Sequence, residues 1–288
     1  MKRLIKPAID IASSTLERFQ THNCVMLAAG IAYFSLISIA PMLVLVLSIT
    51  TIFVGPGTGE RQLLTQLADF IGRDGADAVA GMVESARLGG RSVWMTIIGG
   101  AVLLFGATTL FAKLTDSLNV VFEVPEKVRT STIRGTLRSR LVSLSVVVGI
   151  GFLLLVSLVA DAALVSLFGH IREFLQQRVA IVLAVFQFLV STALSTVLLG
   201  AIMEVMPARR PSWRHALAGG LFSALLLAAT KLLFGLYLRH GNIASSYGAA
   251  GAIVVVLLWA YAAAIVLFLG AEFAAVLMVR HGETPRPK

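Results

Sequence analysis

The chain has 288 residues, of which 57% are hydrophobic and only 14% are charged. Soluble domains carry about 25% charged residues, so this composition excludes an ordinary soluble enzyme and favours a protein whose outer surface faces lipid. The net charge of +9 would suggest a nucleic-acid partner in a soluble protein, so the placement of the basic residues decides what that charge means. The single cysteine, Cys24, excludes an intramolecular disulfide.

An amphipathic helix is predicted at the start of the chain. Apolar residues recur there at spacings of four and three, at Ile5, Ile9, Ala12, Leu16 and Phe19. We expect residues 1–24 to form a cytoplasmic interfacial helix before the first span, and the charged residues of this segment argue against a cleavable secretory signal. The alternative is that the apolar stripe packs against the helical bundle.

Six continuous apolar runs are each long enough to cross the hydrocarbon layer, which is roughly 30 Å thick, as a helix. They are Val25–Val54, Val93–Ala112, Leu141–Phe168, Val179–Met203, Ala216–Leu238 and Gly251–Val279. Barrel strands would alternate apolar and polar residues, which these runs do not do, so helices are predicted. The expected fold is an all-α polytopic membrane protein with a six-helix transmembrane domain over 25–279 and a cytoplasmic tail over 280–288.

Segment 60–88, between the first two spans, is predicted to form a helical hairpin on the outer surface. Two stretches within it repeat the apolar spacing of an amphipathic helix, and the sequence Gly-Arg-Asp-Gly at 72–75 separates them. As for the first helix, packing on the bundle is the alternative to contact with lipid.

The basic residues are distributed unevenly over the connections between spans. Sixteen of the 24 Lys and Arg residues fall in the N-terminal segment, in 113–140, in 204–215 and in the tail, whereas seven fall in the connections on the opposite side. By the positive-inside rule, both termini are predicted to be cytoplasmic. Most of the basic excess then reflects topology, so we expect membrane lipids and no nucleic acid as partners.

Four ionisable side chains lie within predicted spans, where insertion costs several kcal/mol and each is therefore a candidate functional group. They are Asp161, Glu204, Lys231 and Glu272. Asp161 and Lys231 lie at matching depth below the outer surface, which suggests an ion pair between the third and fifth spans. The alternative is that Lys231 extends to the outer headgroups while Asp161 is hydrated in a cleft.

Glu204 and Glu272 lie near the cytoplasmic ends of the fourth and sixth spans. A carboxylate at this position can form a salt bridge at a helix end, with Lys113 or Arg209 as the expected partner. A proton relay is the alternative, and the salt bridge is favoured because a shift of one helical turn would expose either carboxylate.

Two features of the backbone predict irregular helices. Pro41 removes a hydrogen bond near the middle of the first span, which is 30 residues long, and should kink it. Before the sixth span, segment 241–251 combines small residues and hydroxyls with Tyr247, which is typical of a close-packed helix entry or a re-entrant turn. Close packing alone is the alternative for the glycines.

No catalytic motif is found. The five histidines lie one to a connection or terminus, and the chain contains no metalloprotease motif, phosphate-binding loop or nucleophile elbow. We therefore expect no enzyme activity, no cofactor, no metal and no ATPase within the chain.

Several short motifs occur in a fixed order along the chain. They are Ala-Ala-Gly-Ile-Ala-Tyr-Phe-Ser-Leu-Ile-Ser-Ile-Ala-Pro at 28–41, Phe-Gly-Ala at 105–107, Asp-Ser-Leu-Asn at 116–119, Tyr-Gly-Ala-Ala-Gly at 247–251, Leu-Trp-Ala-Tyr at 258–261 and Gly-Ala-Glu-Phe at 270–273. With these motifs, nearly the whole chain resembles the YihY/BrkB family of bacterial inner-membrane proteins, formerly labelled ribonuclease BN.

The resemblance implies six helices with both termini inside and a role in the cell envelope. It marks as candidate positions Tyr33, Pro41, Asp116, Asn119, Tyr247, Gly248, Gly251 and Glu272. The ribonuclease label does not fit this chain, because hydrolytic nucleases need clustered carboxylates or histidines, commonly with metal, and these residues are scattered here.

These features are compatible with three functions. The favoured one is an inner-membrane transporter or flippase-like factor for envelope lipid or lipopolysaccharide, without its own ATPase. The alternative is a non-catalytic scaffold that organises an envelope complex with protein partners. A membrane-bound ribonuclease is the least favoured, and the sequence does not indicate an oligomeric state.

Overall fold

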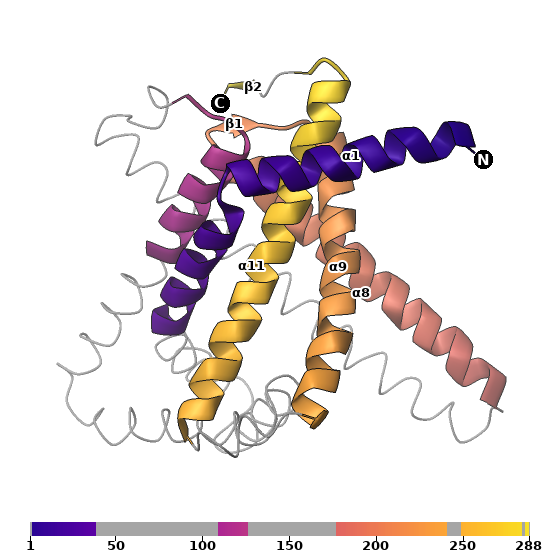
Figure 1. The fold of residues 1–288 in the computed structure, drawn as a ribbon. Coiled ribbons are helices and arrows are strands. Elements are labelled where there is room, and N and C mark those ends of the chain that lie inside the picture. The colour runs from indigo at the N-terminus through magenta and orange to yellow at the C-terminus, as the bar shows by residue number, and fades with distance from the viewer. Residues whose placement is uncertain (1, 39–108, 126–176, 241–248, 284–285, 288) are drawn as a thin grey trace, which may run out of the picture. The chain divides into compact units, whose positions relative to one another are not determined.

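The structure is a computed structural model that describes residues 2–38, 109–125, 177–240, 249–283 and 286–287 (Figure 1). Helices make up nearly all of these residues, as predicted. They are α1 (Lys2–Thr21), the helix Cys24–Ser38, a helix at 109–121, α8 (Gln177–Val205), α9 (Trp213–His240) and α11 (Ala249–Arg280).

Within the described residues, three helices are long and apolar enough to cross a membrane. They are Phe188–Val205 within α8, Trp213–Tyr237 within α9 and Ile253–Arg280 within α11, and they coincide with the fourth, fifth and sixth predicted spans. The pair Ile9–Thr21 and Cys24–Ser38 would be a fourth candidate if it is counted as one broken span. The third predicted span, most of the second and the outer hairpin lie outside the described residues.

Large apolar side chains remain exposed on these helices, among them Leu189 on α8 (59%) and Leu232 on α9 (72%). A helix that is apolar all round needs either a protein core or lipid to cover it. The exposed leucines therefore indicate faces that lipid covers in a membrane.

By contacts between residues, the chain divides into two compact units. The first contains Met1–Cys24, Thr115–Ala228 and Val266–Lys288, and the second contains Val25–Leu114 and Ala229–Ile265. The candidate site lies within the first unit.

In the first unit, helices α8, α9 and α11 approach each other through glycines. A Cβ atom placed on Gly219 of α9 would lie 2.5 Å from the carbonyl oxygen of Gly270 on α11, and one placed on Gly220 would overlap the carbonyl oxygen of Thr196 on α8. Such backbone contact is typical of helices that pack within a membrane. The Ser223 hydroxyl of α9 donates to the carbonyl of Val266 at 3.1 Å, which satisfies this buried polar group.

The helix at 109–121 continues nine residues beyond Ala112, where the second span was predicted to end. Leu114, Leu118 and Val121 in this extension are buried, while Lys113 and Asp116 are exposed. The extension is amphipathic, so a search for continuous apolar runs does not detect it.

A short antiparallel sheet was not expected from the sequence. Strand β1 (Arg209–Arg210) pairs with β2 (Arg286–Pro287), with Arg209 opposite Pro287 and Arg210 opposite Arg286. The last residues of the predicted tail therefore pair with the connection between α8 and α9 (Figure 1). Strands of two residues are too short to show an alternating pattern.

Candidate functional site

The carboxylate of Glu272 lies in the C-terminal part of α11 and is fully buried, with 0% exposure. It is eight residues before the end of the helix at Arg280, or about 12 Å along the helix axis. Its neighbours Ala271, Ala274 and Ala275 are also buried and carry no polar side chain. A carboxylate in such surroundings is tolerated only when it is paired and hydrogen-bonded.

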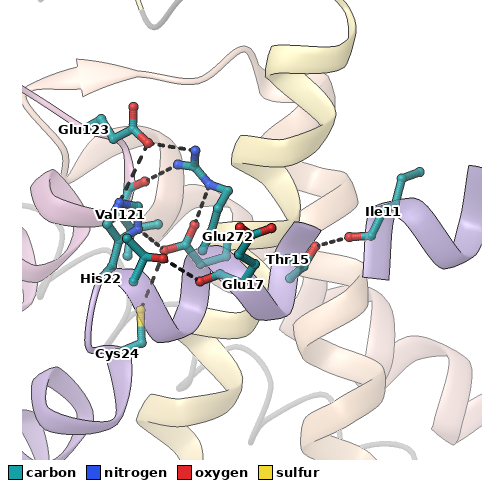
Figure 2. Close-up of polar contacts among 10 residues, drawn as sticks. Ile11, Thr15, Glu17, His22, Cys24, Val121, Glu123 and Glu272 are labelled. Carbon is teal, nitrogen blue, oxygen red and sulfur yellow. Dashed lines mark hydrogen bonds and ion pairs between the residues drawn. The ribbon is translucent and has the colours of Figure 1, made fainter. Parts of the chain in front are cut away.

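The partners of Glu272 come from the end of α1 and the residues that follow it (Figure 2). Arg18 Nε donates to Glu272 Oε2 at 3.0 Å, and His22 Nδ1 lies 2.5 Å from Oε1. The thiol of Cys24 also donates to Oε1, at 3.7 Å. Because an ionised carboxylate only accepts hydrogen bonds, His22 Nδ1 is the donor in its contact. Both carboxylate oxygens are thus satisfied by residues about 250 positions away in the sequence.

Arg18 also binds the end of the helix at 109–121. Its Nη2 donates to the carbonyl of Val121 at 3.1 Å, and its Nη1 lies 2.7 Å from Glu123 Oε1. The last carbonyls of a helix lack partners within the helix and favour a nearby cation. A single guanidinium therefore connects α1, the helix at 109–121 and α11. We call Arg18, His22, Cys24, Glu123 and Glu272 the ionic cluster.

The local backbone brings His22 and Cys24 to Glu272. Helix α1 ends at Thr21, and the next helix begins at Cys24, so only His22 and Asn23 separate them. Asn23 has a φ of 51°, a left-handed conformation that asparagine tolerates better than most residues and that commonly ends helices. This tight break places an imidazole and a thiol beside the carboxylate.

Glu123 adopts the same left-handed conformation, with a φ of 51°, two residues after the end of the helix at 109–121. Its N–H donates to the carbonyl of Val120 at 3.0 Å, and the N–H of Val124 donates to the carbonyl of Asn119 at 2.9 Å, which is the hydrogen-bond pattern of a Schellman helix end. At this helix end the Glu123 side chain contacts Arg18 and, at 3.7 Å, His22 Nε2.

The ionic cluster contains one more acidic than permanently basic group. Glu272 and Glu123 carry two negative charges against the single positive charge of Arg18. A neutral His22 leaves a net charge of −1, and a protonated His22 makes the cluster neutral. The cluster thus combines a buried salt bridge with an imidazole that lies close to both carboxylates.

The two predicted carboxylates near helix ends have partners other than those expected. Glu272 pairs with Arg18 and His22, where Lys113 or Arg209 was expected. Glu204, at the end of α8, is 8% exposed and pairs with Arg210 Nη1 at 3.7 Å.

Asp161 lies outside the described residues, so its predicted pairing with Lys231 stays a prediction. Lys231 itself lies on an exposed side of α9.

Among the positions marked by the family resemblance, Asn119 has the clearest structural role. It is buried, and its Oδ1 accepts a hydrogen bond of 2.7 Å from the backbone N–H of Ala208, between α8 and β1. Asp116, one turn earlier, is exposed. Asn119 therefore connects the helix at 109–121 to the end of α8, within the same unit as the ionic cluster.

Glu272, another marked position, belongs to the ionic cluster, and the structure also describes Tyr33 and Gly251. Tyr33 is 57% exposed, and its ring meets the edge of Phe34 at 5.4 Å between centroids. Gly251 belongs to α11. Pro41, Tyr247 and Gly248 lie outside the described residues, as does the predicted kink.

Sequence reasoning did not identify Arg18 and His22 as site residues. Arg18 lies in α1 and His22 directly follows it, four positions later. This spacing, away from the apolar stripe, is the only local sign that the two side chains share a polar face. Their partner Glu272 was recognised because a carboxylate interrupts an apolar run.

A second polar group forms where α9 begins and α11 ends. His215 Nδ1 lies 2.7 Å from the hydroxyl of Ser212 and 3.5 Å from Glu283 Oε2, and His215 Nε2 lies 3.2 Å from His281 Nδ1. The two histidines are 66 residues apart, so no local sequence pattern predicts that they pair. In the part of the chain that the structure describes, no group of three or more His, Cys, Asp and Glu is placed to hold a metal ion.

Comparison with known proteins identifies the family. The chain is 29% identical to UPF0761 membrane proteins of Alkalilimnicola ehrlichii and Nitrosospira multiformis, in each case over 95% of this chain, and it spans only 59% and 62% of their lengths. It is 24% identical, over 92% of this chain and 94% of the relative, to YfkH of Bacillus subtilis, which is named as ribonuclease-like. No solved structure matches the chain.

The model of the family described as virulence factor BrkB matches residues 15–288. This range includes every motif on which the resemblance was based, as well as the whole ionic cluster. The predicted resemblance is therefore confirmed, and the chain belongs to the BrkB (YihY) family of membrane proteins.

Proposed function

We propose that this protein is an inner-membrane transporter or flippase-like factor for an envelope lipid or lipopolysaccharide, with both termini cytoplasmic. The observation that carries the proposal is the fully buried Glu272 on an otherwise apolar helix, paired with Arg18 and His22. An ionisable group within a spanning helix is costly and usually serves the passage of a substrate or ion. A helix that only anchored the protein would be more stable with alanine or leucine at this position.

The proposed source of energy is a proton or a partner protein, because the sequence contains no nucleotide-binding motif. Loss of charge on Glu272 would weaken its ion pair with Arg18 and its hydrogen bond with His22. Since these contacts join α1 to α11, the charge state of the ionic cluster would control how firmly α1 is held. Membrane lipids are the proposed partners, and envelope proteins are further candidates.

We also propose that the protein is not an enzyme, although one relative is named as ribonuclease-like. Hydrolysis of RNA requires carboxylates or imidazoles that can reach a phosphodiester or bind a metal. Glu272 is enclosed by its own partners and has no exposed surface. Rigorously purified protein is expected to leave RNA intact with or without Mg²⁺ or Mn²⁺, and metal-dependent cleavage that co-purifies with the protein would contradict this.

Transport is tested in proteoliposomes that contain the purified full-length protein. Fluorescent phospholipid and labelled lipid A report redistribution across the bilayer through their accessibility to a membrane-impermeant quencher, with and without a pH gradient. Glu272→Gln is expected to slow redistribution by about tenfold, which corresponds to roughly 1.4 kcal/mol. Glu17→Gln is the matched control, because it removes an exposed carboxylate of α1 that does not belong to the ionic cluster.

Two outcomes would overturn the transport proposal. The first is no redistribution of either lipid by the native protein under any gradient or with membrane extract added. The second is equal redistribution by the native protein and by Glu272→Gln. If Glu272→Gln instead changed only which envelope proteins co-purify, the scaffold function would be favoured.

A further inference from the structure

Helix α1 presents an apolar face that the described part of the chain leaves uncovered. Ile9 and Leu16 are 60% and 53% exposed, and Ala12 between them is exposed as well. These residues are spaced by three and four positions and therefore lie on one side of the helix. They are the central members of the predicted stripe, and Phe19, its last member, is buried.

The face of α1 that contacts the protein is a different one. Arg18 contacts Glu272, and Thr15 and Phe19 beside it are only 5% and 7% exposed. Successive residues of a helix are rotated by about 100°. The exposed apolar stripe is thus turned about a quarter of a circle from the packed face. Ser13 and Glu17 lie on the far side of the stripe and are exposed.

The height of α1 along α11 follows from the length of the apolar helix. The apolar window Ile253–Arg280 has 28 residues, or about 42 Å of helix, which exceeds the hydrocarbon layer by roughly 12 Å. With this excess at the end that carries Arg280, Glu272 lies near the border between hydrocarbon and headgroups, because it is about the same distance before the helix end. The Arg18–Glu272 pair holds α1 at this level, and α1 crosses the C-terminal part of α11 instead of running along it (Figure 1).

The charge of α1 fits an anionic surface. Its first five residues include Lys2, Arg3 and Lys6 and no acidic residue. Each basic residue near an anionic bilayer contributes about 1 kcal/mol of attraction. A helix with an apolar stripe, a basic start and a position at the hydrocarbon border has the properties of an interfacial helix.

From this geometry we propose that α1 lies in the headgroup layer of an anionic bilayer, with Ile9 and Leu16 inserted at the acyl boundary and Arg18 anchoring it to α11. The lipid surface is the occupant of the exposed stripe. This assignment is independent of the transport function, because an interfacial α1 would also suit a scaffold.

The test measures the depth of spin labels in the full-length protein in nanodiscs, on a Cys24→Ser background that keeps a hydroxyl donor beside Glu272. Labels replace Ile9 and Leu16 in the stripe and, as matched controls on the same helix, Ser13 and Glu17. Oxygen concentrates in lipid and a nickel chelate in water, so their relative access reports depth. Labels at 9 and 16 are expected to favour oxygen, and labels at 13 and 17 the nickel chelate.

Two results would overturn the proposal, because each would show that something other than lipid covers the exposed stripe. Labels at 9 and 16 that are as accessible to the nickel chelate as those at 13 and 17 would leave the stripe in water, free for a protein partner. Labels at 9 and 16 that neither reagent reaches would show that the chain itself covers the stripe.

Nanodiscs with about one third phosphatidylglycerol are compared with nanodiscs of phosphatidylcholine alone. Equal depth in both would contradict the role of the basic residues.

Discussion

The first unit is held together in two physically different ways. Where α8, α9 and α11 meet at Gly219, Gly220 and Gly270, backbones touch and no atom can be added. At the ionic cluster, by contrast, long side chains with opposite charges connect α1, the helix at 109–121 and α11. The glycine contact depends on shape alone and does not respond to protons or ligands. The cluster depends on charge and can be adjusted, so the functional candidates are found there.

The largest effect is expected from filling the glycine contact. Gly220→Ala would force its Cβ into the carbonyl oxygen of Thr196, and neither backbone can move cheaply. We expect a loss of about 3 kcal/mol of stability, measured as a lower midpoint of thermal unfolding in detergent. The matched control is Gly235→Ala, also on α9, where no atom lies within 4 Å of the added Cβ. That substitution should be neutral or stabilising by about 0.5–1 kcal/mol. Equal effects of the two would contradict the contact.

Removing the buried carboxylate should have the next largest effect. Glu272→Ala leaves Arg18 and His22 without their shared acceptor, and breaking a buried pair costs about 3–5 kcal/mol. Because the Arg18 side chain is 24% exposed and keeps Val121 and Glu123 as partners, we expect a smaller cost of about 2 kcal/mol. The double variant with Arg18→Gln should cost less than the sum of the two single variants. Strict additivity in a double-mutant cycle would show that the two side chains are not coupled.

A smaller effect is expected at the neutral hydrogen bond beside the cluster. Asn119→Ala removes the acceptor of the Ala208 N–H, and an unsatisfied buried donor costs about 1–2 kcal/mol. The loss should appear as faster hydrogen exchange of the Ala208 amide and of the residues around β1. Asp116→Ala, on an exposed side of the same helix, serves as the control and should leave this exchange unchanged. Unchanged exchange at Ala208 in Asn119→Ala would rule out the hydrogen bond.

The smallest effect is expected at the exposed side of the cluster. Glu123 is 61% exposed, so its ion pair with Arg18 should contribute about 0.5 kcal/mol or less. Glu123→Gln is expected to lower the unfolding midpoint slightly in low salt and not at all at about 1 M salt, where the Debye length is about 3 Å. An effect as large as that of Glu272→Ala would place the functional charge on Glu123 instead of Glu272.

Apolar runs sufficed to predict α8, α9 and α11, because a membrane span needs about 20 apolar residues in sequence and little else. The same criterion missed the extension of the helix at 109–121, in which Leu114, Leu118 and Val121 form a stripe beside charged residues. It also missed β1 and β2, since two residues carry no periodic pattern. Local sequence therefore predicts the helices that must be apolar because they span a membrane. It misses the elements that form through contacts with the rest of the chain.

Only one side of the central ion pair in the candidate site could be predicted from the sequence. A carboxylate within an apolar run stands out by its cost, and Glu272 was identified for that reason. Its partners did not stand out, because Arg18 and His22 lie on a surface helix where charges are ordinary. Nothing local distinguishes an arginine that faces water from one that meets a carboxylate 254 residues later. Pairing between distant polar residues depends on how the helices assemble.

The three-way contact of Arg18 also has a consequence for biosynthesis. Ribosomes and translocons insert helices in order, so Arg18 and His22 reach the membrane surface well before α11 exists. Glu272 follows Arg18 by 254 residues, so the carboxylate can join the cluster only after those residues have been made. A chain that stops before α11 has α1 in place without its anchor. The ion pair thus distinguishes a chain that contains α11 from one that stops before it.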